Sequence, residues 1–209
     1  MIYLFEGTDN IEINFVDTAA AALNRQRTEK IRQYRSPNDK INGTIVYLLL
    51  RYALKKEFGI TEPPELVYRK RGKPYLKHHN DIYFNFSHCK NAAACVVSHA
   101  ETAIDIIDIR TVQKSTARHV CSPEELQMLD QCDDYDRSFL RLWTQKECYA
   151  KWDGQGLALD FSRLTDSLPV IKSMIHHETE QYIMTCYSCE PASIVFFHHP
   201  YELLDSIQQ

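Results

Sequence analysis

The sequence predicts a mixed α+β fold with a boundary near residues 98–102, and three segments carry this prediction. Residues 40–58 form a long apolar helical pattern that ends at a glycine. Residues 82–87 alternate strictly between two faces, as a half-buried strand does. Residues 134–152 have the pattern of a second long helix. With 209 residues and 44% hydrophobic composition, the chain is long enough to bury a substantial core.

The elements of the first half follow from local signals. Strands are expected at 2–5 and 11–15, on either side of a turn at 7–10, and a helix is expected at 17–35. The Ser36-Pro37 step ends that helix and supplies a cap for the next one. After a loop at Pro63-Pro64, we expect further strands at 65–69, 82–87 and 92–98.

The second half begins with a strand at 103–109. A helix starts at Ser122, with Pro123 in the first helical position and Glu125 placed to complete a capping box. The helix at 134–152 follows, and the remaining strands are expected at 168–175, 181–188 and 192–198. We expect glycines 154 and 156 to end the long helix rather than to bind phosphate, because they follow it.

Composition narrows the class of protein. No run of about 18 apolar residues and no signal-peptide pattern is present, so a cytoplasmic protein without a membrane span is expected. The seven cysteines are scattered, which indicates reduced thiols, and the Cys-x-x-Cys pair at 186–189 lacks the second pair of ligands that a zinc site needs.

Charge is distributed unevenly along the chain. The net charge is −4, yet residues 24–35 and 68–74 are two basic groups. Each could be a solvated surface, but both together indicate a local anionic ligand. The two basic groups could also belong to a nucleic-acid-binding module, although the negative net charge and the scarcity of interleaved aromatic residues argue against that function.

Two carboxylates lie where apolar side chains are expected. On a helical wheel Glu147 falls between Trp143 and Leu140, inside the apolar sector. An ion pair with Lys151 at i,i+4 would stabilise the helix by only about 0.3–0.5 kcal/mol, too little to offset burial of a charge. Glu147 therefore lies either at the edge of the apolar stripe or in a cleft with a stronger partner.

Asp105 raises the same question in the strand TAIDIIDIR. Side chains alternate along a strand, so Asp105 and Asp108 cannot face the same site. Two carboxylates from different elements could hold Mg²⁺, and the basic groups could hold phosphates. Lys146 and Lys151 could then neutralise charge on a transferring phosphoryl group. The residues alone thus predict a Mg²⁺-dependent enzyme that acts on a phosphorylated or pyrophosphate ligand.

Several ordered motifs in residues 25–160 together resemble the Sfp-type 4′-phosphopantetheinyl transferases. The motifs are RGKPYL (71–76), FNFSHC (84–89), AIDI (103–106), SPEEL (122–126) and WTQKECYAKWDGQGL (143–157). The resemblance implies Mg²⁺-dependent transfer of the phosphopantetheine arm of coenzyme A to a serine of an acyl or peptidyl carrier protein. The by-product would be 3′,5′-ADP.

The resemblance also implies roles for residues. Asp105 and Glu147 match the metal-binding acids of the family. Together with Lys151 they match its catalytic residues, and Lys151 would contact the pyrophosphate of coenzyme A. The Glu147 carboxylate, directly or through a water, is the candidate base for the carrier serine. The residues expected to bind coenzyme A are Arg27, Lys30, Lys73, Ser87, His88 and Lys151.

The chain departs from the family pattern in places. Ile107 stands where many relatives have a second strand acid, so the metal would have two protein carboxylates, and the preference between Mg²⁺ and Mn²⁺ could change. This departure leaves open a coenzyme A- or carrier-protein-binding homologue with little or no transferase activity. Glu125 matches an acid sometimes given a catalytic role, but a capping box explains it equally well.

In family terms the fold should consist of two similar α/β halves, residues 1–100 and 101–209, with the ligand cleft between them. The first half would carry the basic residues that contact coenzyme A, and the second half the metal-binding strand and helix. A monomer with an internal pseudo-dimer is expected.

Overall fold

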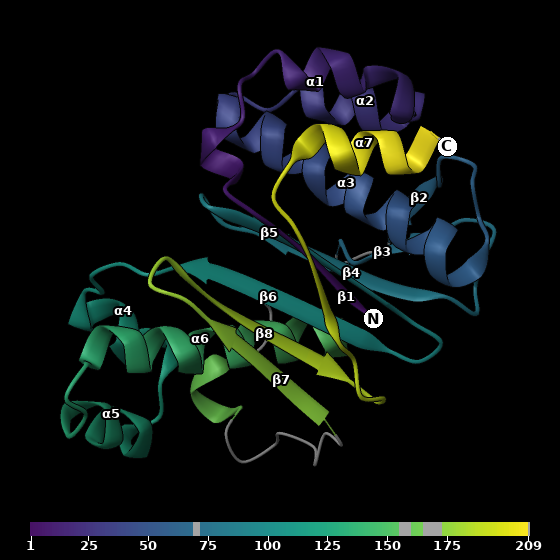
Figure 1. Ribbon diagram of the computed structural model, residues 1–209. Helices are drawn as coiled ribbons and strands as arrows, with labels where there is room; N and C mark the ends of the chain where they lie inside the picture. Colours follow the sequence, from purple (N-terminus) through teal and green to yellow (C-terminus); the bar gives the residue numbers. More distant parts are fainter. Residues whose placement is uncertain (69–71, 155–159, 165–172, 209) are drawn as a thin grey trace.

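A computed structural model describes residues 1–68, 72–154, 160–164 and 173–208. It confirms the α+β class. Two β-sheets pack face to face, and each has a long helix on its outer side, α3 (Pro37–Phe58) on the first and α6 (Tyr135–Asp153) on the second (Figure 1). The space between the sheets is filled by apolar side chains of both, among them Leu4, Val96 and Ile104.

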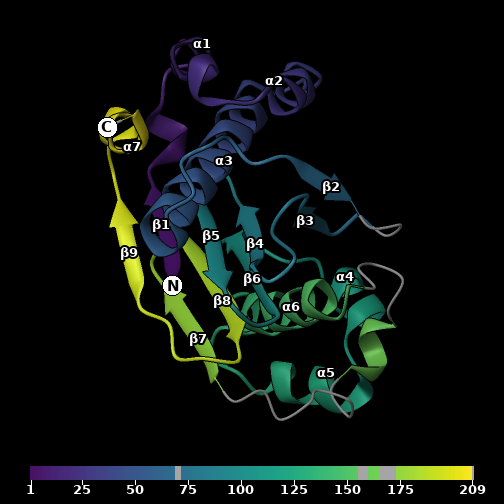
Figure 2. The same cartoon turned by 90° about the vertical axis from the view of Figure 1, so that its right-hand side faces the viewer.

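The first sheet has the strand order β4-β5-β1-β9. Its strands are β4 (Tyr83–His88), β5 (Ala92–Ser98), β1 (Ile2–Glu6) and β9 (Ile194–Phe197). β4 and β1 both pair antiparallel with β5, whereas β9 runs parallel to β1. A small hairpin of β2 (Leu66–Tyr68) and β3 (Pro74–Leu76) lies beside this sheet (Figure 2).

Helix α3 begins and ends at the residues that the sequence indicates. The Ser36 hydroxyl accepts a hydrogen bond from the amide of Asp39 at 3.5 Å, and Pro37 occupies the first turn. Gly59 ends the helix with φ of 68°, a left-handed conformation that favours glycine. The middle of the helix, from Ile41 to Leu54, is buried apart from Tyr52, which explains its nearly continuous apolar sequence.

The segment before α3 differs from the prediction. The strand expected at 11–15 is wrong, and the helix expected at 17–35 is divided into shorter pieces. The pieces are the 3₁₀ helix η1 (Thr8–Asn10), α1 (Phe15–Thr18), the 3₁₀ helix η2 (Ala19–Ala22) and α2 (Arg25–Arg32). β1 already pairs with β5 and β9, so it offers no free edge to a following strand. Asn24 starts α2 anew by accepting a hydrogen bond from the amide of Arg27 at 2.7 Å.

The second sheet has the order β6-β8-β7 and is antiparallel throughout. Its strands are β6 (Thr102–Asp108), β8 (Tyr182–Ser188) and β7 (Ser173–Glu178). β7 overlaps the strand expected at 168–175 and continues to Glu178, and residues 168–172 fall outside the described residues. Three short helices gather near α6, namely α4 (Lys114–Val120), α5 (Pro123–Asp130) and the 3₁₀ helix η4 (Phe161–Arg163).

The end of the chain returns to the first sheet. After β8 the chain forms β9 against β1 and then α7 (Pro200–Gln208), which lies beside α3 (Figure 2). Leu203, Leu204 and Ile207 of α7 belong to the same core cluster as the buried side of α3. The β5–β6 turn lies at the expected boundary near residue 100, but residues 194–208 pack with the first half. The division into halves 1–100 and 101–209 stays a prediction.

None of the helices in the described part of the chain is both long and apolar enough to cross a membrane. All seven cysteines are free, and Cys186 is buried in the sheet whereas Cys189 is exposed.

Candidate functional site

Strand β6 directs its two aspartates to different places, as the alternation of side chains requires. Asp108 accepts hydrogen bonds from the backbone amide of Lys90, at 2.9 and 3.1 Å, and from the side-chain amide of Asn91 at 3.0 Å. It therefore caps the turn between β4 and β5. Asp105 points to the other side of β6, toward α6, and only 6% of it is exposed.

Asp105 meets one residue from each of two other elements. Its Oδ1 accepts hydrogen bonds from Ser87 Oγ of β4 at 3.0 Å and from Lys151 Nζ of α6 at 2.6 Å. Lys151 also donates to Ser87 Oγ at 2.9 Å and to the carbonyl of Ile104 at 3.1 Å. The sequence prediction placed these three side chains in one site, and the structure brings them into direct contact.

Glu147 lies on the same side of α6 as Lys151, one helical turn before it, and interacts electrostatically with Asp105. Partial burial raises the pKa of Glu147, the nearby charge of Asp105 raises it further, and Lys151 acts in the opposite direction. Glu147 is half-buried, and its charged neighbours are Asp105 and Lys151. A cation near the two acids would offset their repulsion, and that Asp105 and Glu147 hold such a cation stays a prediction.

The donors present suit a hard divalent cation. Carboxylate oxygens are what Mg²⁺ and Mn²⁺ take from proteins, commonly with water and phosphate oxygens completing the shell. Within the described residues, no three His, Cys, Asp or Glu side chains gather into a metal-binding group, so Asp105 and Glu147 would act as a pair.

The next residue on this face of β6, two positions after Asp105, is the apolar Ile107. It packs into the cluster of α6 aromatic residues and lines a pocket of about 280 Å³ together with Phe139, Leu140 and Trp143. No third carboxylate can come from this point of the strand.

His88 and Arg27 extend the site toward the first half. Partial desolvation lowers the pKa of His88; Asp39 raises it, and Lys151 and Arg27 lower it further, so these groups lie in one electrostatic neighbourhood. The Arg27 guanidinium is buried, however, and donates to the carbonyl of Gly43 from both Nε and Nη2. Its assignment as a contact to coenzyme A stays a prediction, and its present role is to hold α2 on α3.

Lys30 and Lys73 are not in contact with Asp105. Lys30 Nζ donates to the hydroxyl of Tyr68 at 3.0 Å and lies 4.5 Å from the centre of that ring. Lys73 pairs with Glu101 and donates to the carbonyl of Trp152, near the end of α6, at 3.0 Å. Part of the second basic group, residues 69–71, falls outside the described residues, as does Gly156. Gly154 does end α6, with φ of 75°.

Lys146 is a correction to the sequence analysis. It does not face the two acids but points into the core, where Nζ donates to Glu125 Oε2 at 2.6 Å and to the carbonyls of Phe161 at 2.7 Å and Val120 at 2.9 Å. Glu125 also completes the capping box of α5 by accepting from the amide of Ser122 at 2.7 Å. The capping function is thus confirmed, with a buried ion pair in addition.

Sequence reasoning missed two contributions. The Lys146–Glu125 pair was not foreseen, because nothing local links residues that are 21 positions apart. Asn85 was placed on the correct face of β4, but its function was not recognised: its side-chain oxygen accepts from the amide of Ile104 at 3.1 Å and joins β4 to β6. An amide on a strictly alternating, otherwise aromatic strand was the available signal.

Comparison with known proteins identifies related proteins. Residues 101–200 match the family described as the 4′-phosphopantetheinyl transferase superfamily. A 4′-phosphopantetheinyl transferase from Bacillus subtilis is 31% identical over 150 residues, covering 68% of this chain and 65% of the relative.

Two further relatives carry the same description. The transferase HetI of a Nostoc species is 30% identical over 149 residues, covering 66% of this chain and 62% of the relative. The transferase gsp of Aneurinibacillus migulanus is 23% identical over 186 residues, covering 87% and 77%. The chain spans slightly less than two thirds of the length of the first two relatives. These matches show that the chain belongs to the Sfp-type 4′-phosphopantetheinyl transferase family.

Proposed function

We propose that the chain transfers the 4′-phosphopantetheine arm of coenzyme A to a serine of an acyl or peptidyl carrier protein, with release of 3′,5′-ADP. The observation that supports this most is the convergence of Asp105, Glu147 and Lys151, from one strand and one helix, with Ser87 of the first sheet. Such a group can bind a diphosphate and a divalent cation together.

Asp105 and Glu147 would hold Mg²⁺, or Mn²⁺ in its place. When bound, the ion would neutralise negative charge on the diphosphate of coenzyme A.

Lys151 would exchange its present acceptors, Ser87 and Asp105, for a diphosphate oxygen and stabilise the charge that develops there. Ser87 and His88 would line the coenzyme A site in the cleft between the two similar halves. Lys30 and Lys73, and Arg27 after release from Gly43, would contribute positive charge toward the adenosine and 3′-phosphate end.

The transfer is a substitution at phosphorus. The carrier serine oxygen forms a bond to the phosphorus that bears the pantetheine arm. The bond from that phosphorus to the bridging oxygen breaks, and 3′,5′-ADP leaves with the electron pair. Glu147, directly or through a water molecule, would accept the serine proton.

The test is incubation with coenzyme A, Mg²⁺ and a panel of apo-carrier proteins, followed by mass spectrometry of the carriers. The expected result is a mass increase on one carrier that equals one phosphopantetheine group. Absence of any increase, together with measurable binding of coenzyme A, would instead favour the binding homologue that Ile107 leaves open.

A further inference from the structure

The ammonium of Lys146 is enclosed completely. Its side chain is 1% exposed, and its three N–H groups have the three acceptors described above, Val120, Glu125 and Phe161. A lysine has three donors, so this arrangement leaves none for a ligand. The group that neutralises it, the carboxylate of Glu125, is 5% exposed.

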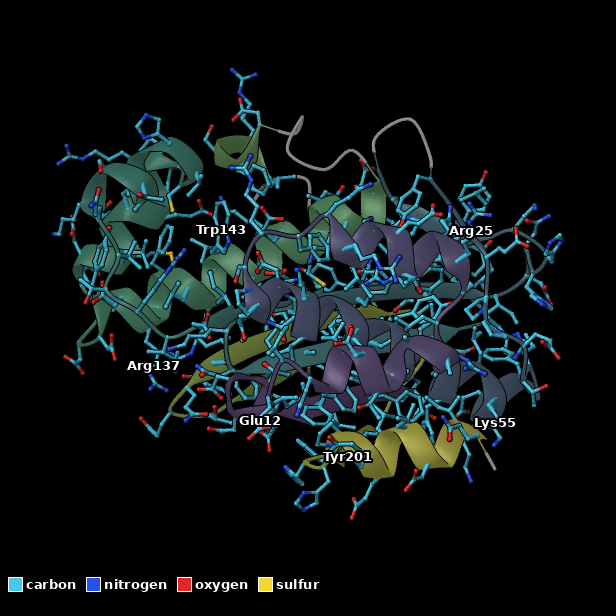
Figure 3. All side chains as sticks on the ribbon, turned by 90° about the horizontal axis from the view of Figure 1, so that it is seen from above. Glu12, Arg25, Lys55, Arg137, Trp143 and Tyr201 are labelled. Carbon is cyan, nitrogen blue, oxygen red and sulfur yellow. The ribbon has the colours of Figure 1, made fainter. Side chains whose placement is uncertain are left out.

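The three acceptors come from three separate segments around α6. Val120 is the last residue of α4, Glu125 lies in the first turn of α5, and Phe161 begins η4. Three directional hydrogen bonds from one side chain resist rotation of α6 about its own axis and its displacement along that axis. Aromatic stacking supports the same contact, since Trp143 stacks on Phe161, with ring centres 5.5 Å apart and an interplanar angle of 18°. Trp143, labelled in Figure 3, projects from α6 on this side.

The orientation of α6 determines where Glu147 points. Lys146 and Glu147 are neighbours, so their side chains leave the helix about 100° apart. When Lys146 is fixed in the α4–α5–η4 contact, Lys151 reaches Ser87 and Asp105, and Glu147, one turn before Lys151, lies on the same side of α6. A small rotation of α6 would separate the two acids, and metal sites lose affinity when their ligands are displaced by fractions of an ångström.

We propose that Lys146 and Glu125 are positioning residues that set the orientation of α6 and thereby hold Glu147 against Asp105 in the geometry that binds the divalent ion. The inference rests on the proposed function of that site. It assigns Glu125 to support of the metal site rather than to proton transfer, because its Oε2 is occupied by both the Ser122 amide and the Lys146 ammonium.

The experiment measures Mn²⁺ binding by electron paramagnetic resonance and transfer rates for the wild type, Glu125→Gln, Lys146→Met and the double variant. All measurements are made well below each unfolding midpoint. We expect each single variant to bind Mn²⁺ about tenfold more weakly, in the range found for groups that orient metal ligands. The double variant should be no worse than the weaker single variant, because both act through one contact.

The fluorescence of Trp143, recorded in a Trp152→Phe background, follows the contact directly, as the chain has two tryptophans. We expect the same spectral change in each variant. Lys114→Met is the matched control, because Lys114 and Asp130 form a solvent-exposed ion pair, with 2.9 Å between Nζ and Oδ1. It should leave Mn²⁺ affinity and fluorescence unchanged.

Several outcomes would overturn the proposal. One is Glu125→Gln abolishing transfer while Mn²⁺ affinity stays at the wild-type value, which would make Glu125 a chemical participant. Another is a lower unfolding midpoint in the variants with no change in Mn²⁺ affinity, which would leave the pair a purely structural role. If Lys146→Met does not fold, the milder Glu125→Gln decides. Failure of the wild type itself to bind Mn²⁺ would contradict the proposed function instead.

Discussion

Helix α6 contributes a lysine to each of two ion pairs, Lys146 with Glu125 and Lys151 with Asp105. The two pairs have the same chemistry but differ in their exposure to solvent. The side chains of Lys146 and Glu125 are 1% and 5% exposed, whereas those of Lys151 and Asp105 are 26% and 9% exposed. In the first pair every donor of the lysine has a protein acceptor within the core. In the second pair the lysine is partly open to solvent, and the free acid Glu147 stands beside it. A buried pair in which every donor of the lysine has a protein acceptor stabilises the fold. A pair that solvent reaches can exchange a protein partner for a ligand.

The largest expected effect concerns stability in the first pair. Lys146→Met leaves the Glu125 carboxylate buried without its counter-charge, a change that typically costs about 3–5 kcal/mol. Lys151→Met removes hydrogen bonds at a site that water reaches, and we expect a loss of about 1–2 kcal/mol. Urea denaturation of both variants checks the comparison. Equal losses would show that the two pairs do not differ in the way their burial indicates.

The next effect concerns activity in the second pair. Asp105→Asn and Glu147→Gln should each reduce the rate of transfer to an apo-carrier protein about 100-fold or more, while circular dichroism stays that of the wild type. The physical reason is loss of one of only two protein carboxylates available to the cation. A variant with full activity would remove its residue from the metal site.

A smaller effect of opposite sign is expected for the stability of Glu147→Gln. The folded-state pKa of Glu147 is raised, by desolvation and then by Asp105, so the folded protein binds this proton more tightly than the unfolded chain does. The stability that protonation provides is complete below the unfolded pKa, about 4.3, and is lost as pH rises through the folded value.

Glutamine resembles the protonated acid. In metal-free protein at pH 7, Glu147→Gln should therefore be more stable than the wild type by about 0.5–2 kcal/mol, the usual range when a functional site is relieved of unfavourable charge. The gain should disappear near pH 4, and thermal unfolding at both pH values measures it. A variant that is less stable at pH 7 would contradict the electrostatic account of the site.

The smallest effect is expected for a third pair, which serves as the exposed reference. The side chains of Lys114 and Asp130 are 65% and 60% exposed, and solvent screens their attraction. Lys114→Met should not measurably change the urea midpoint. A clear loss would mean that burial is a poor guide to the difference between the two pairs of α6.

Local sequence predicted much of the fold and the centre of the site. Ser36 and Gly59 mark the ends of α3, the Ser122 capping box marks the start of α5, and Gly154 ends α6, because helix ends depend on groups within a few residues. The acids at 105 and 147 could be identified because each interrupts an apolar pattern, and that interruption is visible without a structure.

Other features depend on segments far apart in the chain. The return of β9 and α7 to the first sheet depends on β1 pairing with β5 on one edge only and leaving the other edge for β9, which no local pattern reveals. The burial of Arg27 depends on the carbonyl of Gly43 being turned toward it.

Residues 143–157 show the division most clearly. That a helix there carries charged side chains on a mainly apolar face and ends at a glycine can be predicted from these residues alone. The separate functions of Lys146, a structural residue, and of Lys151, which lies in the candidate site, became visible only in the folded chain. The function of a charge depends on the partners around it, and here those partners, Glu125, Ser87 and Asp105, come from α5, β4 and β6.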